Sequence, residues 1–410
     1  MADHYDDLET RPPEERERSL FDRLRAQIAE AKAAAPGLAR HLDGVEPGAI
    51  TDRAALARLP VLRKAALVEM QRGDPPFGGL TTRPPQAFTH VFQSPGPIYE
   101  PGMDTPDWWR FARALWAGGL RPDDIVINCF AYHLTPAGHM FDSGARAVGA
   151  TVIPGGVGNT EAQVAAAADL GATAYAGTPD FLKVMIEKAD ELGHALKIGK
   201  AIVGGGPLFP AVRQFYTDRG ISCLQGYGTA DLGSIAYESS AMEGMIVDEG
   251  AIVEIVRPGT GDPVPEGEVG EVLVTVLNAD YPLVRFATGD LSAVLAGRSP
   301  CGRTNMRIKG WMGRADQTTK VRGMFVRPEQ VDAVVKRHPE VLKARLTVTR
   351  ADEQDVMTLA VETQSPSPEL AAAIAETLRD VVKLRGEVEC DIPGSLPNDG
   401  KVIDDLRKFD

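Results

Sequence analysis

The run Ile125-Val126-Ile127-Asn128-Cys129-Phe130 decides the fold class, because a short apolar segment of this kind is typical of a buried β-strand. Ala150-Thr151-Val152-Ile153 repeats the pattern after an interval long enough for one helix. Residues 200–203 and 221–225 are predicted to be two further strands of the same sheet. The alternation of strands with helices predicts a parallel sheet that helices cover on both faces.

The helices themselves are predicted from their N-terminal signals. Thr160 and Gln163 match a capping-box pair, and Thr178 followed by Pro179 marks the start of the next helix. Near the N-terminus, residues 14–35 carry apolar side chains at helical spacing with charges between them. That pattern predicts an amphipathic helix packed on the main body of the protein.

The character of the chain changes in three further places. The Pro/Gly-rich segment 75–101 is expected to lack regular structure. Residues 251–256 and 271–277 are predicted strands, which indicate a small antiparallel sheet or barrel. Beyond Arg314, helical and strand patterns indicate a compact α+β domain. The predicted fold class is therefore α/β, with a large N-terminal domain of parallel α/β sheets plus a small β sheet or barrel, followed by a small α+β domain.

Composition excludes several classes of function. The chain has 410 residues, 43% of them hydrophobic, enough for a large core and more than one domain. Its 44 Lys and Arg face 57 Asp and Glu, and a net charge of −13 disfavours a nucleic-acid partner. Four widely spaced cysteines without a C-x-x-C pair argue against a disulfide framework and a cysteine-based zinc site. With no signal-peptide stretch and no apolar run approaching the roughly 18 residues of a membrane span, we expect a soluble cytoplasmic protein.

Four polar, glycine-containing segments follow one another in the C-terminal half. They are Gln225-Gly226-Tyr227-Gly228-Thr229-Ala230-Asp231, Arg285-Phe286-Ala287-Thr288-Gly289-Asp290, Gly313-Arg314-Ala315-Asp316 and Gly394-Ser395-Leu396-Pro397-Asn398-Asp399-Gly400-Lys401. In this order the segments resemble the adenylate-forming acyl-CoA ligases, specifically the phenylacetate–CoA ligase branch. The resemblance extends over nearly the whole chain.

The resemblance implies an AMP-forming acid–CoA ligase. Such an enzyme makes an acyl-adenylate from a carboxylic acid, here of the aryl or arylacetic type, and ATP, and then transfers the acyl group to CoA. Lys401 matches the catalytic lysine of the family. An ammonium group is a compact point charge that can stabilise the negative charge developing at the α-phosphate. Without the other segments, the same lysine would be read as a solvated residue in a surface loop.

The other segments imply contacts with the nucleotide. Tyr227, followed by Gly228, matches the tyrosine that stacks on adenine, and Asp231 takes the place of the acid that holds Mg²⁺. Asp290 matches the aspartate that accepts hydrogen bonds from both ribose hydroxyls, and Arg314 matches an arginine that also reaches the ribose. Each of these residues could instead serve only as part of a turn or a strand end.

Further site residues are implied by the same resemblance. Backbone contacts with adenine are expected from Gly205, Gly206 and Pro207. The acid pocket is expected to include Tyr132, His133, Gly155 and Gly156, although a His beside a Tyr is more often a structural group.

The resemblance also implies a two-domain enzyme that changes conformation during its reaction. Residues 1–315 would form the adenylation domain and residues 316–410 a mobile lid, with Asp316 as the hinge and Arg322 and Gly323 on the CoA side. The expected cofactors and small-molecule partners are the acid, ATP or AMP, Mg²⁺ and CoA, without zinc, and a homodimer is allowed for.

One segment departs from the family pattern. The family has a Ser/Thr/Gly-rich phosphate-binding loop, whereas this chain has Gln93-Ser94-Pro95-Gly96-Pro97-Ile98-Tyr99-Glu100-Pro101. The three prolines lack N–H donors, and Glu100 stands where a cation is usual. Two alternatives therefore stay open. The chain is a catalytically altered member that binds nucleotide or acyl-CoA without adenylation, or it starts the same chemistry from something other than free ATP.

Overall fold

A computed structural model describes residues 4–94, 97–315, 317, 319–322, 324–351 and 354–407. The chain forms two compact units. The first unit comprises Met1–Val253, Val274–Thr288 and Val294–Trp311. The second unit comprises Glu254–Leu273, Gly289–Ala293 and Met312–Asp410.

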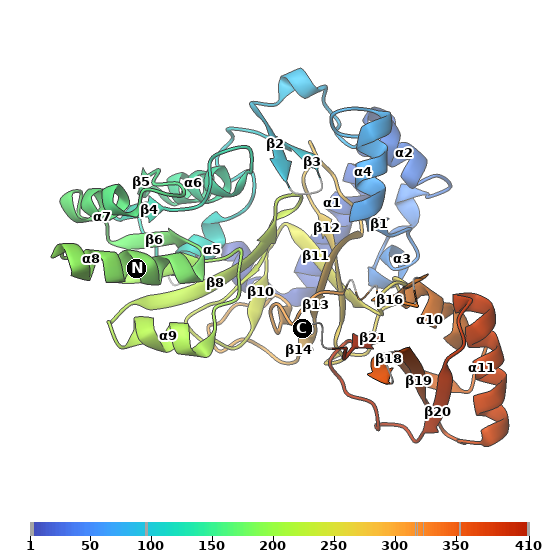
Figure 1. Ribbon diagram of the computed structural model, residues 1–410. Helices are drawn as coiled ribbons and strands as arrows, with labels where there is room; N and C mark the ends of the chain where they lie inside the picture. The colour runs from blue at the N-terminus through green and yellow to red at the C-terminus, as the bar shows by residue number, and fades with distance from the viewer. Residues whose placement is uncertain are drawn as a thin grey trace. The chain divides into compact units, whose positions relative to one another are not determined.

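A nine-stranded sheet forms the framework of the first unit, with the strand order β14-β15-β10-β9-β8-β7-β6-β4-β5 (Figure 1). The strands are β4 (Ile125–Asn128), β5 (Thr151–Ile153), β6 (Ala174–Gly177), β7 (Lys200–Val203), β8 (Ser222–Thr229), β9 (Gly233–Tyr237), β10 (Met245–Val247), β14 (Val294–Leu295) and β15 (Arg307–Ile308). The five strands from β5 to β8 are parallel, and the remaining pairs are antiparallel. The predicted parallel sheet is confirmed, with an antiparallel extension.

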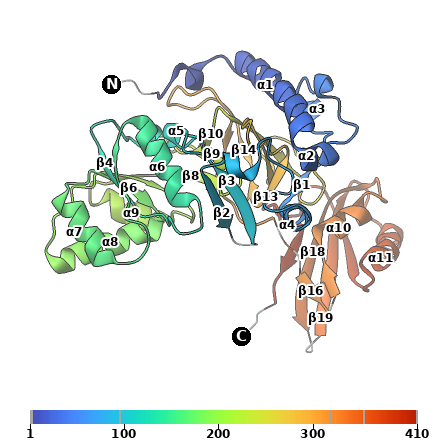
Figure 2. The ribbon, with the colours of Figure 1, turned by 90° about the horizontal axis from the view of Figure 1, so that it is seen from above.

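Helices cover both faces of the parallel strands (Figures 1 and 2). One apolar cluster contains side chains of α5 (Ala112–Ala117) and α6 (Ala137–Val148). The cluster on the other side contains side chains of α7 (Thr160–Asp169), α8 (Pro179–Leu192) and α9 (Pro210–Thr217). The parallel strands are therefore buried on both sides, as their continuous apolar runs predict.

The predicted capping box at Thr160 is not formed. Asn159 is the N-cap residue of α7, and its side chain makes no capping hydrogen bond. Gln163 instead donates through Nε2 to the backbone oxygens of Gly155, at 3.1 Å, and Gly156, at 2.8 Å. The side chain of Gln163 therefore satisfies two carbonyl groups of the loop before the helix and does not form a capping box.

Helical segments also precede the sheet. These are η1 (Asp7–Thr10), α1 (Pro13–Ala34), α2 (Pro36–His41), η2 (Pro47–Ala49), α3 (Arg53–Leu56), α4 (Lys64–Gly73) and η3 (Pro85–Ala87), where η denotes a 3₁₀ helix. The amphipathic helix predicted over 14–35 is confirmed as α1. Its apolar side chains Leu20, Phe21, Leu24 and Ile28 are buried.

The Pro/Gly-rich segment 75–101 contains a β-hairpin, so the expectation that it lacks regular structure is wrong for its last part. β2 (His90–Ser94) and β3 (Ile98–Gly102) pair in antiparallel register, with Phe92 opposite Glu100 and Ser94 opposite Ile98. Helix α4 holds the hairpin from outside the sheet, because Gln71 bonds both the N–H and the carbonyl group of Tyr99 at 2.8 Å. Tertiary contacts thus stabilise strands that their own composition does not favour.

A smaller sheet has the strand order β1-β13-β12-β11, and its residues belong partly to the first unit and partly to the second. Its strands are β1 (Leu62–Arg63), β11 (Ala251–Val256), β12 (Gly270–Val276) and β13 (Phe286–Ser292). β1 and β13 are parallel. The two strands predicted over 251–256 and 271–277 are confirmed as β11 and β12.

The C-terminal part of the second unit is an α+β structure, as predicted. It contains β16 (Thr319–Val321), β17 (Met324–Val326), α10 (Pro328–Val335), β18 (Val341–Ala351), β19 (Gln354–Thr363), α11 (Pro368–Val382), β20 (Glu387–Asp391) and β21 (Ile403–Asp405). Four of the strands form a sheet of order β20-β19-β18-β21, over an apolar core to which α10 and α11 contribute. The sequence patterns did not predict β21, which begins two residues after Lys401.

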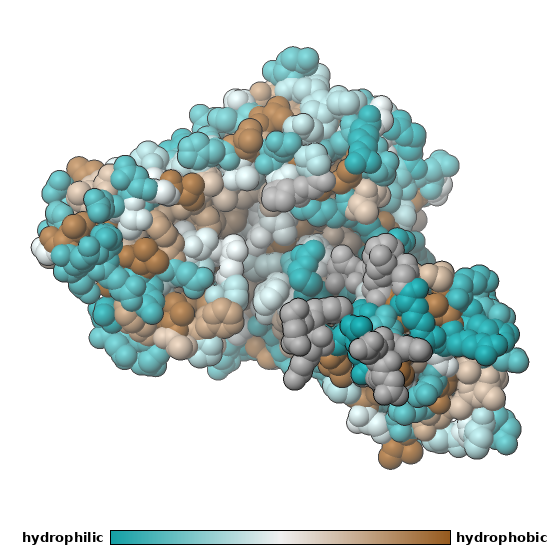
Figure 3. Space-filling view, in the orientation of Figure 1, coloured by the Kyte–Doolittle hydropathy of each residue, from teal (hydrophilic) through white to brown (hydrophobic). Residues whose placement is uncertain are grey.

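The predicted domain boundary after residue 315 stays a prediction, because Asp316 lies outside the described residues. On the face in Figure 3, hydrophilic residues predominate and hydrophobic ones form small separate groups. Within the described parts of the chain, no helix has the length and apolar character needed to cross a bilayer.

Candidate active site

Two of the predicted nucleotide-binding segments meet in the first unit. Tyr227, in β8, is buried, and its hydroxyl group donates a hydrogen bond to Oγ1 of Thr288 at 3.2 Å. Gly228 follows at a register shift between β8 and β9. A Cβ atom at Gly228 would lie 2.5 Å from the carbonyl oxygen of Gly233, so a side chain there would collide with the neighbouring strand.

The predicted glycine turn lies beside this segment. Gly205 has a φ of +71°, which favours glycine, and a Cβ atom at Gly204 would lie 3.2 Å from the carbonyl oxygen of Gly226. The backbone N–H of Leu208 donates to Oε1 of Gln225 at 3.1 Å. The turn with Gly205, Gly206 and Pro207 is therefore close to the segment that carries Tyr227.

Asn128, at the end of β4, joins two of the predicted acid-pocket residues. Its side-chain amide donates to the hydroxyl oxygen of Tyr132 at 2.8 Å, and its backbone carbonyl oxygen accepts from the N–H of Gly156 at 2.9 Å. Gly155 and Gly156 are held from the other side by Gln163. Burial, and then the charge of Asp142, raises the pKa of Tyr132.

The histidine that contacts Tyr132 is His139, which the sequence patterns did not single out. The Tyr132 and His139 rings meet edge-on, with 5.2 Å between their centroids, whereas His133 is exposed. His90 and Phe92, on the same face of β2, also lie against His139, with centroid distances of 4.7 and 5.1 Å. Burial lowers the pKa of His139, and His90 lowers it further. The alternation of His90 and Phe92 was a usable signal, but it lay in the segment expected to be irregular.

The segment that stands in place of the phosphate-binding loop includes β2 and β3 of the hairpin. Glu100 is only 1% exposed and accepts a hydrogen bond from the Ser94 hydroxyl group. Burial, and then the charge of Asp231, raises the pKa of Glu100 to about 8. The Glu100 carboxyl therefore retains its proton at neutral pH. Asp231 is itself buried and pairs with Nζ of Lys64 at 3.1 Å.

In the second unit, Asp290 and Arg314 contact each other directly. The guanidinium Nη1 of Arg314 lies 2.8 Å from Oδ1 of Asp290, and the two residues also form an isolated antiparallel bridge. Asp290 is 7% exposed, and Gly289 before it has a φ of +73°. A Cβ atom at Gly289 would lie 2.8 Å from Nη2 of Arg314, so glycine there leaves room for the arginine.

Lys401 lies in the loop before β21. Its Nζ pairs with Oδ1 of Asp404 at 2.7 Å, and its backbone N–H donates to Asp399. Lys401 and Arg314 both line a cavity of about 300 Å³ within the second unit. Two of the predicted site residues are thus brought to one cavity, although 87 positions separate them in the sequence (401 − 314).

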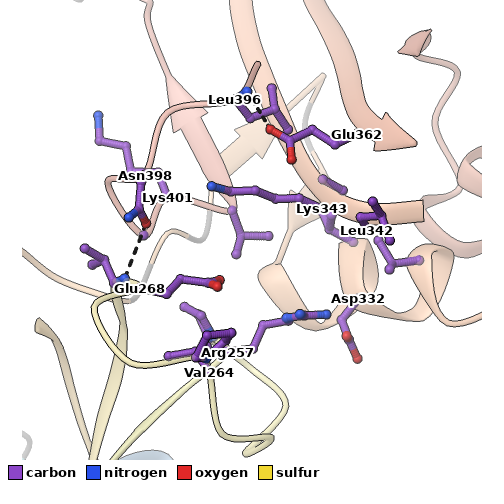
Figure 4. Close-up of a pocket in the computed structure, with 18 of the residues that line it drawn as sticks. Arg257, Val264, Glu268, Asp332, Leu342, Lys343, Glu362, Leu396, Asn398 and Lys401 are labelled. Atoms are coloured by element: carbon purple, nitrogen blue, oxygen red, sulfur yellow. Dashed lines mark hydrogen bonds between the residues drawn. The ribbon is translucent and has the colours of Figure 1, made fainter. Parts of the chain in front are cut away.

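Lys401 also lies at the edge of a larger cavity of about 800 Å³ in the same unit. The turn between β11 and β12 lines this cavity together with α10, β18 and the loop 394–402. Figure 4 shows Lys343, Glu268 and Arg257 extending toward its centre, while the Lys401 ammonium group points away from it. The ammonium group therefore belongs to the smaller cavity, with Arg314.

The structure does not test the three residues predicted for the hinge and the CoA side. Asp316 and Gly323 lie outside the described residues. Arg322 is exposed and bonds to the backbone oxygen and the carboxylate of Asp355. Among the described residues, no group of three or more His, Cys, Asp or Glu side chains could hold a metal ion.

Known proteins resemble this chain over nearly its full length. Residues 108–276 match the AMP-binding enzyme family. A phenylacetate-coenzyme A ligase of Thermus thermophilus is 31% identical over 98% of this chain and 99% of its own. The chain belongs to the phenylacetate–coenzyme A ligase branch of the adenylate-forming ligases. A ligase of the same name from Escherichia coli is 28% identical and covers 98% of both chains.

A solved structure shares the fold of this phenylacetate–CoA ligase family member. The open conformation of 2-hydroxyisobutyryl-CoA ligase, in complex with 2-HIB-AMP and CoA, is 25% identical and has a TM-score of 0.72. The match covers 95% of this chain and 91% of that one. As a member of the branch, the chain is an AMP-forming acid–CoA ligase that works through an acyl-adenylate.

Proposed function

We propose that the acid substrate of this ligase is an aryl or arylacetic-type carboxylic acid and that CoA is the acceptor. The observation that supports this class is the aromatic cluster around Tyr132. His139 packs against Tyr132 and also contacts the rings of His90 and Phe92. A Cβ atom at Gly156 would lie 3.9 Å from the Tyr132 ring. Aromatic side chains favour edge-on or offset contacts with another ring, so an aryl group would be bound in preference to a short aliphatic one. The exposed His133 is proposed to flank the entrance of this pocket.

The nucleotide contacts are proposed residue by residue. Tyr227 and Gly228, with the turn Gly205, Gly206 and Pro207, would contact adenine. Asp290 would accept hydrogen bonds from the ribose hydroxyls, and Arg314, which shares a cavity with Lys401, would contact the same sugar. Lys401 would stabilise the charge at the α-phosphate. To do so, its ammonium group must leave the carboxylate of Asp404 and contact the nucleotide.

Asp231 is proposed to hold Mg²⁺. Its Oδ1 atom is buried and has no hydrogen-bond partner among the described residues, so a hard cation can bind it without displacing an existing bond. When bound, Mg²⁺ would neutralise charge on the nucleotide phosphates. Asp316 would act as the hinge between residues 1–315 and 316–410, and Arg322 and Gly323 would lie on the CoA side. The cytoplasmic location and a homodimer also stay predictions.

An ATP–pyrophosphate exchange assay over a panel of aryl, arylacetic and short aliphatic acids tests this function. We expect the native protein to exchange only with aromatic acids, and Lys401→Ala to lower the rate by about a hundredfold or more, because one preorganised charge is lost. Lys336→Ala is the matched control, since Lys336 also pairs with an aspartate in the second unit, at 2.9 Å, and should leave the rate unchanged.

Two outcomes would contradict the proposal. An unchanged rate in Lys401→Ala would remove the lysine from its proposed role. No exchange by the native protein with any acid, together with measurable AMP binding, would favour the catalytically altered member. The altered hairpin at Ser94 and Glu100 is the observation that would support that alternative.

A further inference from the structure

Three buried oxygen atoms near the β2–β3 hairpin have no hydrogen-bond partner among the described residues. They are Oε2 of Glu100, Oδ1 of Asp231 and the hydroxyl oxygen of Tyr281. The three residues are 1%, 6% and 2% exposed. A buried polar atom without a partner is unfavourable, so three of them near one hairpin indicate a missing ligand.

These side chains come from separate segments that pack together. Glu100 belongs to β3, Asp231 to the turn between β8 and β9, and Tyr281 to the loop between β12 and β13. Helix α4 supports two of the segments, since Lys64 at its start pairs with Asp231, and Gln71 binds the backbone beside Glu100. All of these residues belong to the first unit.

Lys64 and Gln71 lie seven positions apart and therefore on one face of α4, so Asp231 and the strand of Glu100 lie on the same side of that helix. The charge of Asp231 raises the pKa of Glu100, after burial. Burial, and then the charges of Asp231 and Glu100, raises the pKa of Tyr281 well above its usual value. At neutral pH a bound cation would displace the proton of Glu100, and Lys64 would then balance only one of the two negative charges. Buried charge of this kind is stabilised when it is paired or bound to a metal.

We propose that Glu100 and Asp231 together hold one divalent cation through their unpartnered carboxylate oxygens, with the Tyr281 hydroxyl group beside it, and that this site fills without nucleotide. Mg²⁺ commonly binds one or two carboxylates and retains several waters, so two carboxylates suffice. The inference deepens the proposed function, in which Asp231 alone holds the metal. It adds positive charge next to a segment whose three prolines lack N–H donors for phosphate.

The test measures binding of the metal alone to the full chain. Mn²⁺ serves as the probe, followed by electron paramagnetic resonance and by calorimetry, with no nucleotide or acid present. We expect one site in the native protein, and affinity at least tenfold weaker in Glu100→Gln and in Asp231→Asn. Lys64→Met should instead tighten binding, because it removes a positive charge 3.1 Å from the Asp231 carboxylate. A misfolded protein would not give such a gain.

Asp124→Asn is the matched control. Asp124 is likewise a buried carboxylate paired with a lysine, Lys200 at 2.9 Å, and its substitution should leave Mn²⁺ binding unchanged. Absence of Mn²⁺ binding at millimolar concentration would overturn the proposal, because a shared proton or a water molecule would then satisfy these atoms. Equal binding by the native protein and Glu100→Gln would also overturn it. Loss of ligase activity with metal binding intact would count against the proposed function and not against this site.

Discussion

Asp290 lies in β13, where every residue except Gly289 is buried, and its carboxylate already accepts a hydrogen bond from Arg314. The arginine side chain is 58% exposed, so solvent weakens this ion pair. A carboxylate can accept several hydrogen bonds at once, and Arg314 therefore orients Asp290 without excluding a sugar diol. The function of Asp290 therefore depends on which acceptor positions of its carboxylate remain available to a ligand.

Substitution of Asp290 tests its proposed contact with the ribose. We expect Asp290→Ala to weaken AMP binding by about 1.5–3 kcal/mol for each hydrogen bond lost, as measured by calorimetry. Asp262→Ala, at an exposed position of the same unit, is the control and should bind AMP like the native protein. Equal AMP affinity in Asp290→Ala would remove the ribose role.

Asp107 provides a test of pH dependence at a site away from the chemistry. Its carboxylate caps the N–H of Ala112 at 2.8 Å, and burial raises the pKa of the group to about 7. The folded state therefore binds a proton that the unfolded state, with a pKa of 3.8, releases. The contribution of this group to stability falls as the pH rises from about 4 to about 7.

Asp107→Asn should remove this loss of stability at higher pH. Asparagine keeps the hydrogen bond to the N–H of Ala112 but carries no charge. We expect the variant to be more stable than the native protein at about pH 8, by up to a few kcal/mol, and similar near pH 4. Urea unfolding at both pH values measures the difference. Asp169→Asn, at an exposed position, should follow the native profile, and identical profiles for Asp107→Asn would contradict the burial argument.

At the scale of elements, the β2–β3 hairpin distinguishes this chain from its family pattern. The hairpin pairs residue by residue from His90 with Gly102 to Ser94 with Ile98, so its backbone groups are used within the ladder. The Ser94 hydroxyl group is bonded to Glu100 instead of being offered to a ligand. Because Glu100 is buried and protonated near neutral pH, it does not act as a surface charge that repels phosphate, as its sequence position suggested.

The hairpin therefore predicts weak recognition of the β- and γ-phosphates by the protein alone. In the presence of a chelator, we expect ATP and AMP to bind with nearly equal affinity. A loop of free N–H donors would favour ATP by about 1.5–3 kcal/mol for each charge-assisted bond. Competition titrations of the two nucleotides against a fluorescent AMP analogue measure the ratio. A clear preference for ATP without metal would show that other groups replace the loop.

For the molecule as a whole, α1 and the segment before it connect parts of the first unit that are far apart in sequence. Arg16, 2% exposed, pairs through Nε with Glu249 at 2.9 Å and donates through Nη2 to Thr304 at 2.8 Å. Glu9, 1% exposed, pairs with Arg303 at 2.6 Å and accepts a hydrogen bond from Tyr237. These buried charges fix the N-terminal segment against the antiparallel part of the large sheet.

Loss of one partner should be costly, because it leaves a buried charge less well compensated. We expect Arg16→Met to lower the free energy of unfolding by about 3–5 kcal/mol, measured by denaturant titration. Arg18→Met changes an exposed arginine of the same helix and should shift the free energy of unfolding by no more than about 0.5 kcal/mol. A similar small shift in Arg16→Met would mean that Arg11, which also pairs with Glu249, compensates fully.

The sequence alone determined the strand–helix alternation, α1, the C-terminal α+β structure and the family. Each of these depends on local periodicity or on a short motif, and burial and hydrogen bonding repeat every two residues in a strand or every three to four in a helix. A motif such as Tyr227-Gly228 or Thr288-Gly289-Asp290 is likewise readable within a few residues. These features therefore needed no knowledge of distant contacts.

Only the tertiary structure decided which side chains meet. Gln163 binds the loop at Gly156 and not its own helix start, and His139 rather than His133 contacts Tyr132. The hairpin at 90–102 forms in a Pro/Gly-rich segment because α4 and the large sheet supply contacts from elsewhere in the chain. The convergence of Glu100 and Asp231, 131 positions apart (231 − 100), has the same cause. Long-range packing brings such groups together, and no local pattern encodes it.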